Sequence, residues 1–171
     1  MVKRCVQIEL TQEYARSVLN YDPETGVFTW RQSGKGRKTG RMAGCLHRTL
    51  GSVQLQVGGK LYYAHRIAWL YMTGSWPKEH IDHIDGNPGN NAWKNLREAT
   101  NGENMQNQRR CRKDNKSSGL LGVTWSKPAG RWAAQIQING ARKYLGLHDT
   151  PELAHAAYLE AKRELHPFGV I

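Results

Sequence analysis

Acidic residues are missing from a long internal stretch of this chain. No Asp or Glu occurs between Thr25 and Lys78, although the 171 residues include 14 acidic side chains. The basic residues of this stretch are Arg31, Lys35, Arg37, Lys38, Arg41, Arg48, Lys60, Arg66 and Lys78. A net charge of +11 distributed so unevenly is typical of a protein that binds a polyanion, either nucleic acid or an anionic membrane surface.

Long apolar runs are absent as well. No stretch approaches the roughly 18 apolar residues that would span a bilayer, and the basic stretches are rich in glycine instead of forming amphipathic helices. The first five residues, Met1–Cys5, do not lead into the apolar region of a secretory signal. We therefore expect nucleic acid as the partner, no membrane association, and a cytoplasmic location.

Cysteine is scarce. Cys5, Cys45 and Cys111 are too far apart for a Cys-x-x-Cys zinc motif, and an odd number of cysteines argues against a disulfide framework. We expect a reducing compartment and no structural zinc.

Hydrophobic periodicity and turn residues predict an α+β chain of small elements. A chain of this length holds one medium domain or two to three small modules with thin cores. The paired glycines Gly58-Gly59 favour a β-hairpin, because both can take positive φ, and Gly74 is a helix terminator. In chain order the first expected elements are a helix over 10–19, a strand over 27–30, hairpin strands over 52–57 and 60–63, and a helix over 64–73.

The most informative segment for function runs from His80 to Asn107 and combines carboxylate, imidazole and side-chain amide groups. Asp82 and Asn104 offer the hard oxygen atoms that suit a Mg²⁺ ion which keeps several waters and binds a phosphate. His83, next to Asp82, has the side-chain type that can take a proton from water near neutral pH. The expected local structure is a strand over 80–84, a loop over 86–95, a returning strand over 96–98 and a helix over 100–109. Thr100 and Glu103 have the spacing of a helix-capping box.

The sequence His80-Ile-Asp-His-Ile-Asp-Gly-Asn87, with Asn95-Leu-Arg97, Glu103–Asn107 and His65–Trp69 upstream, resembles the HNH endonuclease family in its phage homing form. The resemblance implies a ββα-metal core. It selects His83 as the catalytic histidine, because in the family that residue lies three positions before the glycine equivalent to Gly86. It makes Asp82 and Asn104 the metal ligands, and Asn95 the residue that ties the loop to the strand and holds the catalytic histidine.

The repeated His-Asp pattern leaves some roles open. Whether His80 or Asp85 touches the metal is undecided; we favour a surface or supporting histidine for His80 and a turn residue for Asp85. Consecutive strand residues point to opposite faces, so the strand must end or twist if Asp82 and His83 share a site. Arg66 and Arg97 fit either a phosphate clamp or a structural ion pair.

The resemblance implies a site-specific DNA endonuclease that uses one Mg²⁺ or Mn²⁺ ion per active site. We expect hydrolysis to 5′-phosphate and 3′-hydroxyl ends, nicking of one strand, and a monomer acting on double-stranded DNA in the cytoplasm of a phage-infected host. Two alternatives are a DNA-binding regulator that does not cleave and a defensive nuclease of low specificity.

A polar, basic segment without periodicity follows, from Arg109 to Ser118. It is expected to be a linker that either contacts phosphates or is simply a solvated tether. Its basic residues are Arg109, Arg110, Arg112, Lys113 and Lys116.

The last fifty residues predict three strands, over 122–125, 131–138 and 142–147, followed by a helix from Thr150 to about Leu165. Asn139-Gly140 is a type I′ turn signal, and alternation places Trp132, Ala134, Ile136 and Ile138 against the helix. This pattern resembles the plant ethylene-response-factor (APETALA) DNA-binding domain from Ser118 to about Glu164. The resemblance implies DNA contacts from Thr124, Ser126, Arg131, Gln135, Gln137, Arg142 and Tyr144.

These expectations give four regions. Residues 1–60 form a basic β-hairpin region with DNA contacts from Arg31, Lys35, Arg37, Lys38 and Arg41; residues 61–108 form the nuclease core, to which Arg66 belongs. Residues 109–118 are the linker, and residues 119–171 form the sheet-and-helix DNA-binding domain.

Overall fold

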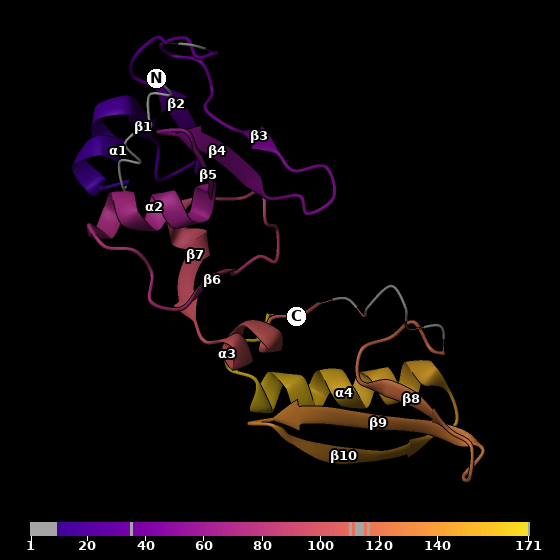
Figure 1. The fold of residues 1–171 in the computed structure, drawn as a ribbon. Helices are drawn as coiled ribbons and strands as arrows, with labels where there is room; N and C mark the ends of the chain where they lie inside the picture. The colour runs from indigo at the N-terminus through magenta and orange to yellow at the C-terminus, as the bar shows by residue number, and fades with distance from the viewer. Residues whose placement is uncertain (1–9, 35, 110, 112–114, 116, 171) are drawn as a thin grey trace, which may run out of the picture. The chain divides into compact units, whose positions relative to one another are not determined.

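The computed structural model describes residues 10–34, 36–109, 111, 115 and 117–170. They form small antiparallel sheets and helices in two compact units, residues 1–98 and 99–171 (Figure 1). The expected α+β class is confirmed. Among the described helices, none is both long and apolar enough to cross a membrane. The predicted DNA contacts Lys35, Arg110, Arg112, Lys113 and Lys116 lie outside the described residues.

The first unit begins with α1 (Gln12–Val18), capped by the Thr11 hydroxyl, which accepts a hydrogen bond from the Tyr14 amide. The helix is shorter than expected because Leu19 is extended and starts β1 (Leu19–Tyr21), which pairs with β2 (Phe28–Trp30). This pairing buries Leu19 completely. Leu19 fits the helical spacing of apolar residues in the sequence, but it lies one residue beyond the end of the helix.

A three-stranded sheet follows, made of β3 (Cys45–Leu46), β4 (Val53–Val57) and β5 (Lys60–Tyr63) in the order β3-β4-β5. Gly58 and Gly59 have φ of 59° and 82°, which confirms the predicted hairpin turn. The two-residue strand β3 was not predicted. No turn-forming residue type follows it directly in the sequence, and its two residues are both exposed, so no pattern marks it as a strand.

Helix α2 (Ala64–Thr73) has the predicted bounds and ends at Gly74, whose φ of 82° is the left-handed conformation that glycine favours. Its residues Ile67 and Leu70 are buried in the same core cluster as Leu55 of β4 and Leu96 of the next hairpin. This shared core joins α2 to the strands that carry the site.

Those strands are β6 (His80–His83) and β7 (Leu96–Ala99), which pair with each other and are connected through the short 3-10 helix η1 (Trp93–Asn95). β6 ends at His83, where the Gly86 amide donates to the His83 carbonyl across a turn. Asp82 and His83 are both buried. Strand β6 thus ends at His83, the position at which the sequence analysis expects it to end or twist if Asp82 and His83 share a site.

The second unit begins with α3 (Asn101–Gln106), and its predicted capping box is present: Thr100 Oγ1 accepts from the Glu103 amide, and the Glu103 carboxylate accepts from the Thr100 amide at 2.8 Å. The helix ends three residues earlier than expected. The Asn107 and Gln108 amides bond to carbonyls three residues earlier, which tightens and ends the last turn.

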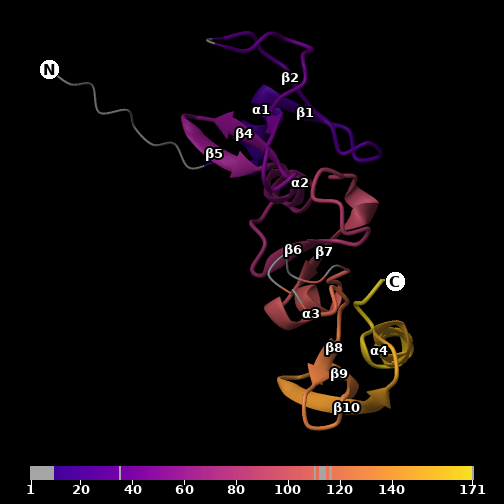
Figure 2. The same ribbon diagram turned by 90° about the vertical axis from the view of Figure 1, so that its right-hand side faces the viewer.

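The remaining elements are β8 (Val123–Ser126), β9 (Arg131–Ile138), β10 (Ala141–His148) and α4 (Pro151–Leu165). The sheet has the order β10-β9-β8, and α4 lies along one face of it (Figures 1 and 2). Ala134 and Ile136 are buried under α4, as predicted. Positive φ at Asn139 and Gly140 confirms the type I′ turn.

Candidate active site

Asp82 lies in the middle of the β6–β7 hairpin and is only 5 % exposed. Arg97 of the neighbouring strand β7 donates to the Asp82 Oδ2 atom from Nη2 at 2.7 Å and from Nε at 2.9 Å. A buried carboxylate is costly unless it is paired, and this charge-assisted contact meets that need. Of the two roles left open for Arg97, the structure shows the ion pair.

His83 is the next residue, and its ring is held by the loop that follows. Nε2 lies 3.3 Å from Oδ1 of Asn91. An amide oxygen accepts, so this contact is a hydrogen bond in the tautomer with the proton on Nε2, in which the lone pair is on Nδ1. Burial lowers the pKa of His83, although Asn91 and the carboxylates of Asp85 and Asp82 partly oppose that shift. The lowered pKa favours the neutral ring, which is the form that the predicted general base needs.

His65, in the first turn of α2, packs its ring edge-on against His83 with 5.1 Å between ring centroids, and stacks on Tyr63 at 5.4 Å. Burial lowers the pKa of His65 to about 4, and the nearby His83 and Arg66 add to the effect. Its Nδ1 atom is buried and has no hydrogen-bond partner among the described residues. On this side the candidate site is thus bordered by two imidazoles whose pKa values are both lowered.

Asn95 ties the loop to the strand, as expected from the resemblance. Its side chain accepts from the Asp85 amide at 2.9 Å and donates to the Asp85 carboxylate at 3.0 Å and to the Asn90 carbonyl at 2.8 Å. Its carbonyl accepts from the Ile84 amide. Asn95 therefore sets the path of the loop, and the loop in turn supplies the Asn91 contact to His83.

Asp85 is a turn residue. Its Oδ1 accepts from the Asn87 amide at 2.8 Å, and its Oδ2 accepts from the Asn90 side chain at 2.7 Å. Burial raises its pKa, but hydrogen bonds from Asn87, Asn90 and Asn95 outweigh that effect and the pKa lies below its usual value. His80, at the other end of the repeat, is exposed. Both placements agree with the supporting roles favoured from the sequence.

Asn91 is the functional residue that the sequence did not reveal. It is 2 % exposed, and its amide nitrogen donates to the Gly89 carbonyl at 3.1 Å. Nothing in a turn-rich loop without periodicity distinguishes it from Asn87 or Asn90.

Asn104 lies on α3, in the second unit, and is half-buried. The structure brings Asp82, His83 and Asn95 together in the first unit, and the sharing of one metal ion by Asp82 and Asn104 stays a prediction. No cluster of three or more His, Cys, Asp or Glu side chains suited to a metal occurs in the described part of the chain. One carboxylate and one amide are hard oxygen ligands and fit a Mg²⁺ ion that keeps several waters.

Comparison with known proteins identifies the family to which residues 62–106 belong. A family model described as HNH endonuclease matches residues 62–106. Protein 3.8 of Escherichia phage T7 is 37 % identical over 103 residues, which are 60 % of this chain and 83 % of that protein. The chain belongs to the HNH endonuclease family. The solved structure "DNA binding and cleavage by the HNH homing endonuclease I-HmuI" is 22 % identical, with a TM-score of 0.42, over 80 % of this chain and 75 % of that one.

The prediction of an HNH endonuclease is thereby confirmed as to enzyme class. The matched segment runs from β5 to the end of α3 and includes all four residues of the predicted site, namely Asp82, His83, Asn95 and Asn104. Their individual roles stay predictions, as does the resemblance of the C-terminal region to the ethylene-response-factor domain.

The C-terminal sheet of this HNH endonuclease collects its predicted DNA contacts on one face. Cross-strand pairing sets Ser126 opposite Arg131, Gln137 opposite Arg142, and Gln135 opposite Tyr144. Opposed residues of antiparallel strands point to the same side. Thr124 joins the group because its hydroxyl accepts from the Gln135 side chain at 3.2 Å. Arg131 also pairs with Asp149 at 2.9 Å.

The predicted contacts of the first unit are partly engaged with its own surface. Arg31 donates to the Arg16 carbonyl at 3.0 Å. The guanidinium groups of Arg37 and Arg66 lie over the rings of Trp30 and Trp76, at 5.1 and 5.9 Å from the ring centroids. The side chains with the greatest freedom to reach a phosphate are exposed, namely Lys38 and Arg41.

Proposed function

We propose that this HNH endonuclease is a site-specific, metal-dependent DNA nickase. The observation that carries the proposal is the buried pair Asp82 and His83 at the end of β6, with the His83 ring fixed through Asn91. The pair places a carboxylate suited to a hard cation beside an imidazole that is neutral at physiological pH. A DNA-binding regulator would have no use for this combination.

In the proposed reaction, Nδ1 of His83 takes a proton from a water molecule, and the water oxygen attacks the scissile phosphorus. The bond from phosphorus to the 3′ oxygen breaks, and the leaving oxygen takes a proton from solvent. The products carry a 5′-phosphate and a 3′-hydroxyl. Asn91 supports this role because a ring that donates from Nε2 presents the lone pair of Nδ1.

Asp82 and Asn104 would hold one Mg²⁺ or Mn²⁺ ion, and no structural zinc is proposed. When bound, the ion supplies charge stabilisation at the phosphate and at the departing oxygen. Arg97 keeps the Asp82 carboxylate in place through its two contacts to Oδ2. The donation to that oxygen fixes the direction of the carboxylate without removing its negative charge.

Double-stranded DNA is the proposed substrate. The acid-free segment between Thr25 and Lys78 would contact phosphates, and the open face of the C-terminal sheet would read bases in the major groove, where Gln pairs with adenine and Arg with guanine. With one predicted active site per chain, we propose a monomer that cuts one strand per binding event. It would act in the cytoplasm of an infected host cell.

The test compares His83→Ala with His80→Ala on supercoiled phage DNA in Mg²⁺ or EDTA. His80 is the matched control, because it belongs to the same strand and repeat but is exposed. We expect discrete Mg²⁺-dependent nicks from the wild type and from His80→Ala. His83→Ala should lose at least about 100-fold in nicking rate, the usual contribution of a general base, with unchanged DNA affinity in a gel-shift assay.

Equal loss of nicking and of DNA binding in His83→Ala would contradict the role of His83. Binding without cutting by the wild type would instead favour the regulator, and cutting at random positions would favour a nuclease of low specificity.

A further inference from the structure

Helix α3, which carries Asn104, is too short to be stable by itself. It has six residues and none of them is buried, whereas isolated helices of fewer than about 12 residues are marginal in water. The capping box satisfies its first turn, but a cap cannot fix the direction of so short a helix. Within the second unit, two sets of contacts hold its other end.

Lys162 of α4 provides the first such contact. It is 2 % exposed, although lysine is rarely buried, and its Nζ donates to the Gln108 carbonyl at 2.7 Å. Gln108 follows the end of α3, where the helix dipole and unpaired carbonyls favour a cation. Burial of this ammonium is costly, and the recipient of its hydrogen bond is the backbone that leaves α3.

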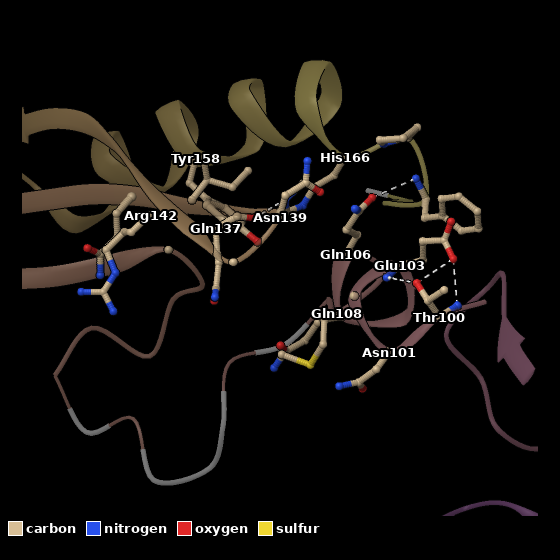
Figure 3. Close-up of a pocket in the computed structure, with 18 residues that line it drawn as sticks. Thr100, Asn101, Glu103, Gln106, Gln108, Gln137, Asn139, Arg142, Tyr158 and His166 are labelled. Carbon is tan, nitrogen blue, oxygen red and sulfur yellow. Dashed lines mark hydrogen bonds between the residues drawn. The ribbon is translucent and has the colours of Figure 1, made fainter. Parts of the chain in front are cut away.

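The C-terminal tail provides the second contact. The Phe168 amide donates to the Gln106 side chain and the Val170 amide to the Asn107 side chain, both at 3.4 Å. Gly169 lies so close that a Cβ atom there would be 2.9 Å from Lys162 Cε and 3.1 Å from the Gln106 carbonyl oxygen. Figure 3 shows Gln106 and its hydrogen bond to this tail. The tail and Lys162 therefore both bind the chain at the C-terminal end of α3.

The other wall of the space beside α3 is the predicted reading face of the sheet. A groove of about 910 Å³ is lined on one side by α3 and its flanking residues, and on the other by Gln135, Gln137 and Arg142 (Figure 3). Both walls belong to the second unit. The helix with the predicted metal ligand and the strands with the predicted base contacts are thus parts of one compact body.

We propose that the C-terminal unit is the scaffold of the metal-ligand helix, and that Lys162 is its positioning residue. The inference rests on the proposed function, in which Asn104 is a metal ligand. The C-terminal unit then contributes to metal binding as well as to DNA recognition, through the contacts that orient α3.

The test is Lys162→Met, with Lys143→Met as the matched control. Methionine keeps the length and packing of the lysine stem but removes the hydrogen bond, and Lys143 is an exposed residue of β10. Full-length proteins with the additional His83→Ala change, which prevents turnover, are bound to target DNA. Free Mn²⁺ is then measured by electron paramagnetic resonance during a titration, and DNA affinity is measured separately in EDTA.

We expect Lys162→Met to weaken Mn²⁺ binding by about tenfold, the lower end of what loss of a supporting contact costs a metal site. Its DNA affinity in EDTA, and both properties of Lys143→Met, should equal those of the parent. In the background with His83 intact, the Mg²⁺ concentration for half-maximal nicking should rise by a similar factor, and excess Mg²⁺ should restore the rate.

A folded Lys162→Met with unchanged Mn²⁺ affinity would overturn the inference. Thermal unfolding shows whether the variant is folded; if it is not, Gly169→Ala, which disturbs the same grip from the tail, takes its place with the same expected result. A parent protein that binds no Mn²⁺ would contradict the proposed function itself, whereas a parent that binds normally isolates the failure to the role of Lys162.

Discussion

At the scale of single residues, the site is built from groups that burial keeps neutral and from one charge that is paired. His65 and His83 lie ring against ring with their pKa values lowered by burial, while Asp82 lies against Arg97. Two cationic imidazoles here would repel each other. Burial therefore favours the neutral form of His83, the proposed base, which can accept a proton. The same burial makes the stability of the folded protein depend on pH.

That dependence is a prediction for His65→Phe. The pKa of His65 falls from the usual 6.5 to about 4 on folding, so between these values the unfolded chain binds a proton that the folded chain does not. Stability is therefore complete above pH 6.5 and is lost as the pH falls toward 4. Phenylalanine keeps the ring and removes the titration, so the variant should lose less stability over this range, by on the order of 2 kcal/mol.

The measurement is urea unfolding of both proteins at pH 7 and pH 4.5. Parallel losses of stability in the wild type and in His65→Phe would show that His65 does not carry the pH dependence.

At the scale of elements, the first turn of α3 gives a second prediction. Thr100→Ala removes the hydroxyl of the capping box and should destabilise the second unit by about 1 kcal/mol. Thr100→Ser keeps the hydroxyl and should destabilise the second unit by only about a few tenths of a kcal/mol. Hydrogen exchange of the amides of α3 measures the effect locally, and equal protection in the alanine and serine variants would contradict the role of the cap.

Elements with their own periodicity and terminators were predictable from the sequence. Helix α2 has its apolar face and Gly74, and strand β9 has its alternation and the Asn139-Gly140 turn. β1 and β3 were not, because Leu19 of β1 continues the helical pattern of α1 and the two residues of β3 are too few to show a period. The end of α3 was missed for a related reason, since its last turn is tightened by local bonds that no residue type announces.

The site shows the same division. Asp82, His83, Asn95 and Asn104 were predicted through a motif with fixed spacing, which the HNH family model covers. Asn91 was missed because the path of a loop, set here by the hydrogen bonds of Asn95, decides which of several asparagines meets His83. Lys162 was missed because a lysine in a helix reads as a surface residue until its burial is known.

At the scale of the whole molecule, the charge of +11 predicts how DNA binding responds to salt. The logarithm of the association constant should fall linearly with the logarithm of salt concentration, by about 0.9 per neutralised phosphate. Lys38→Ala should reduce that slope by about 0.9 if this exposed lysine contacts one phosphate. Tyr144→Ala should leave the slope unchanged, because tyrosine carries no charge there.

Fluorescence anisotropy with labelled DNA between 50 and 300 mM salt, roughly the range in which such slopes are resolved, makes the comparison. A flat response of the wild type would contradict the proposed phosphate footprint.

The division of the chain at Glu98 and Ala99, inside β7, has a consequence for the exchange of modules between nucleases. A chimera joined in the polar segment after Arg109 would separate α3 from Lys162 and the tail, and so receive a new specificity but lose the contacts proposed to orient its metal-ligand helix. A junction at the β7 boundary would transfer both together. Recombination between genes of this kind should therefore give active nucleases when the junction lies at Glu98 and Ala99, inside the HNH motif. It should give inactive ones when the junction lies in the linker over 109–118.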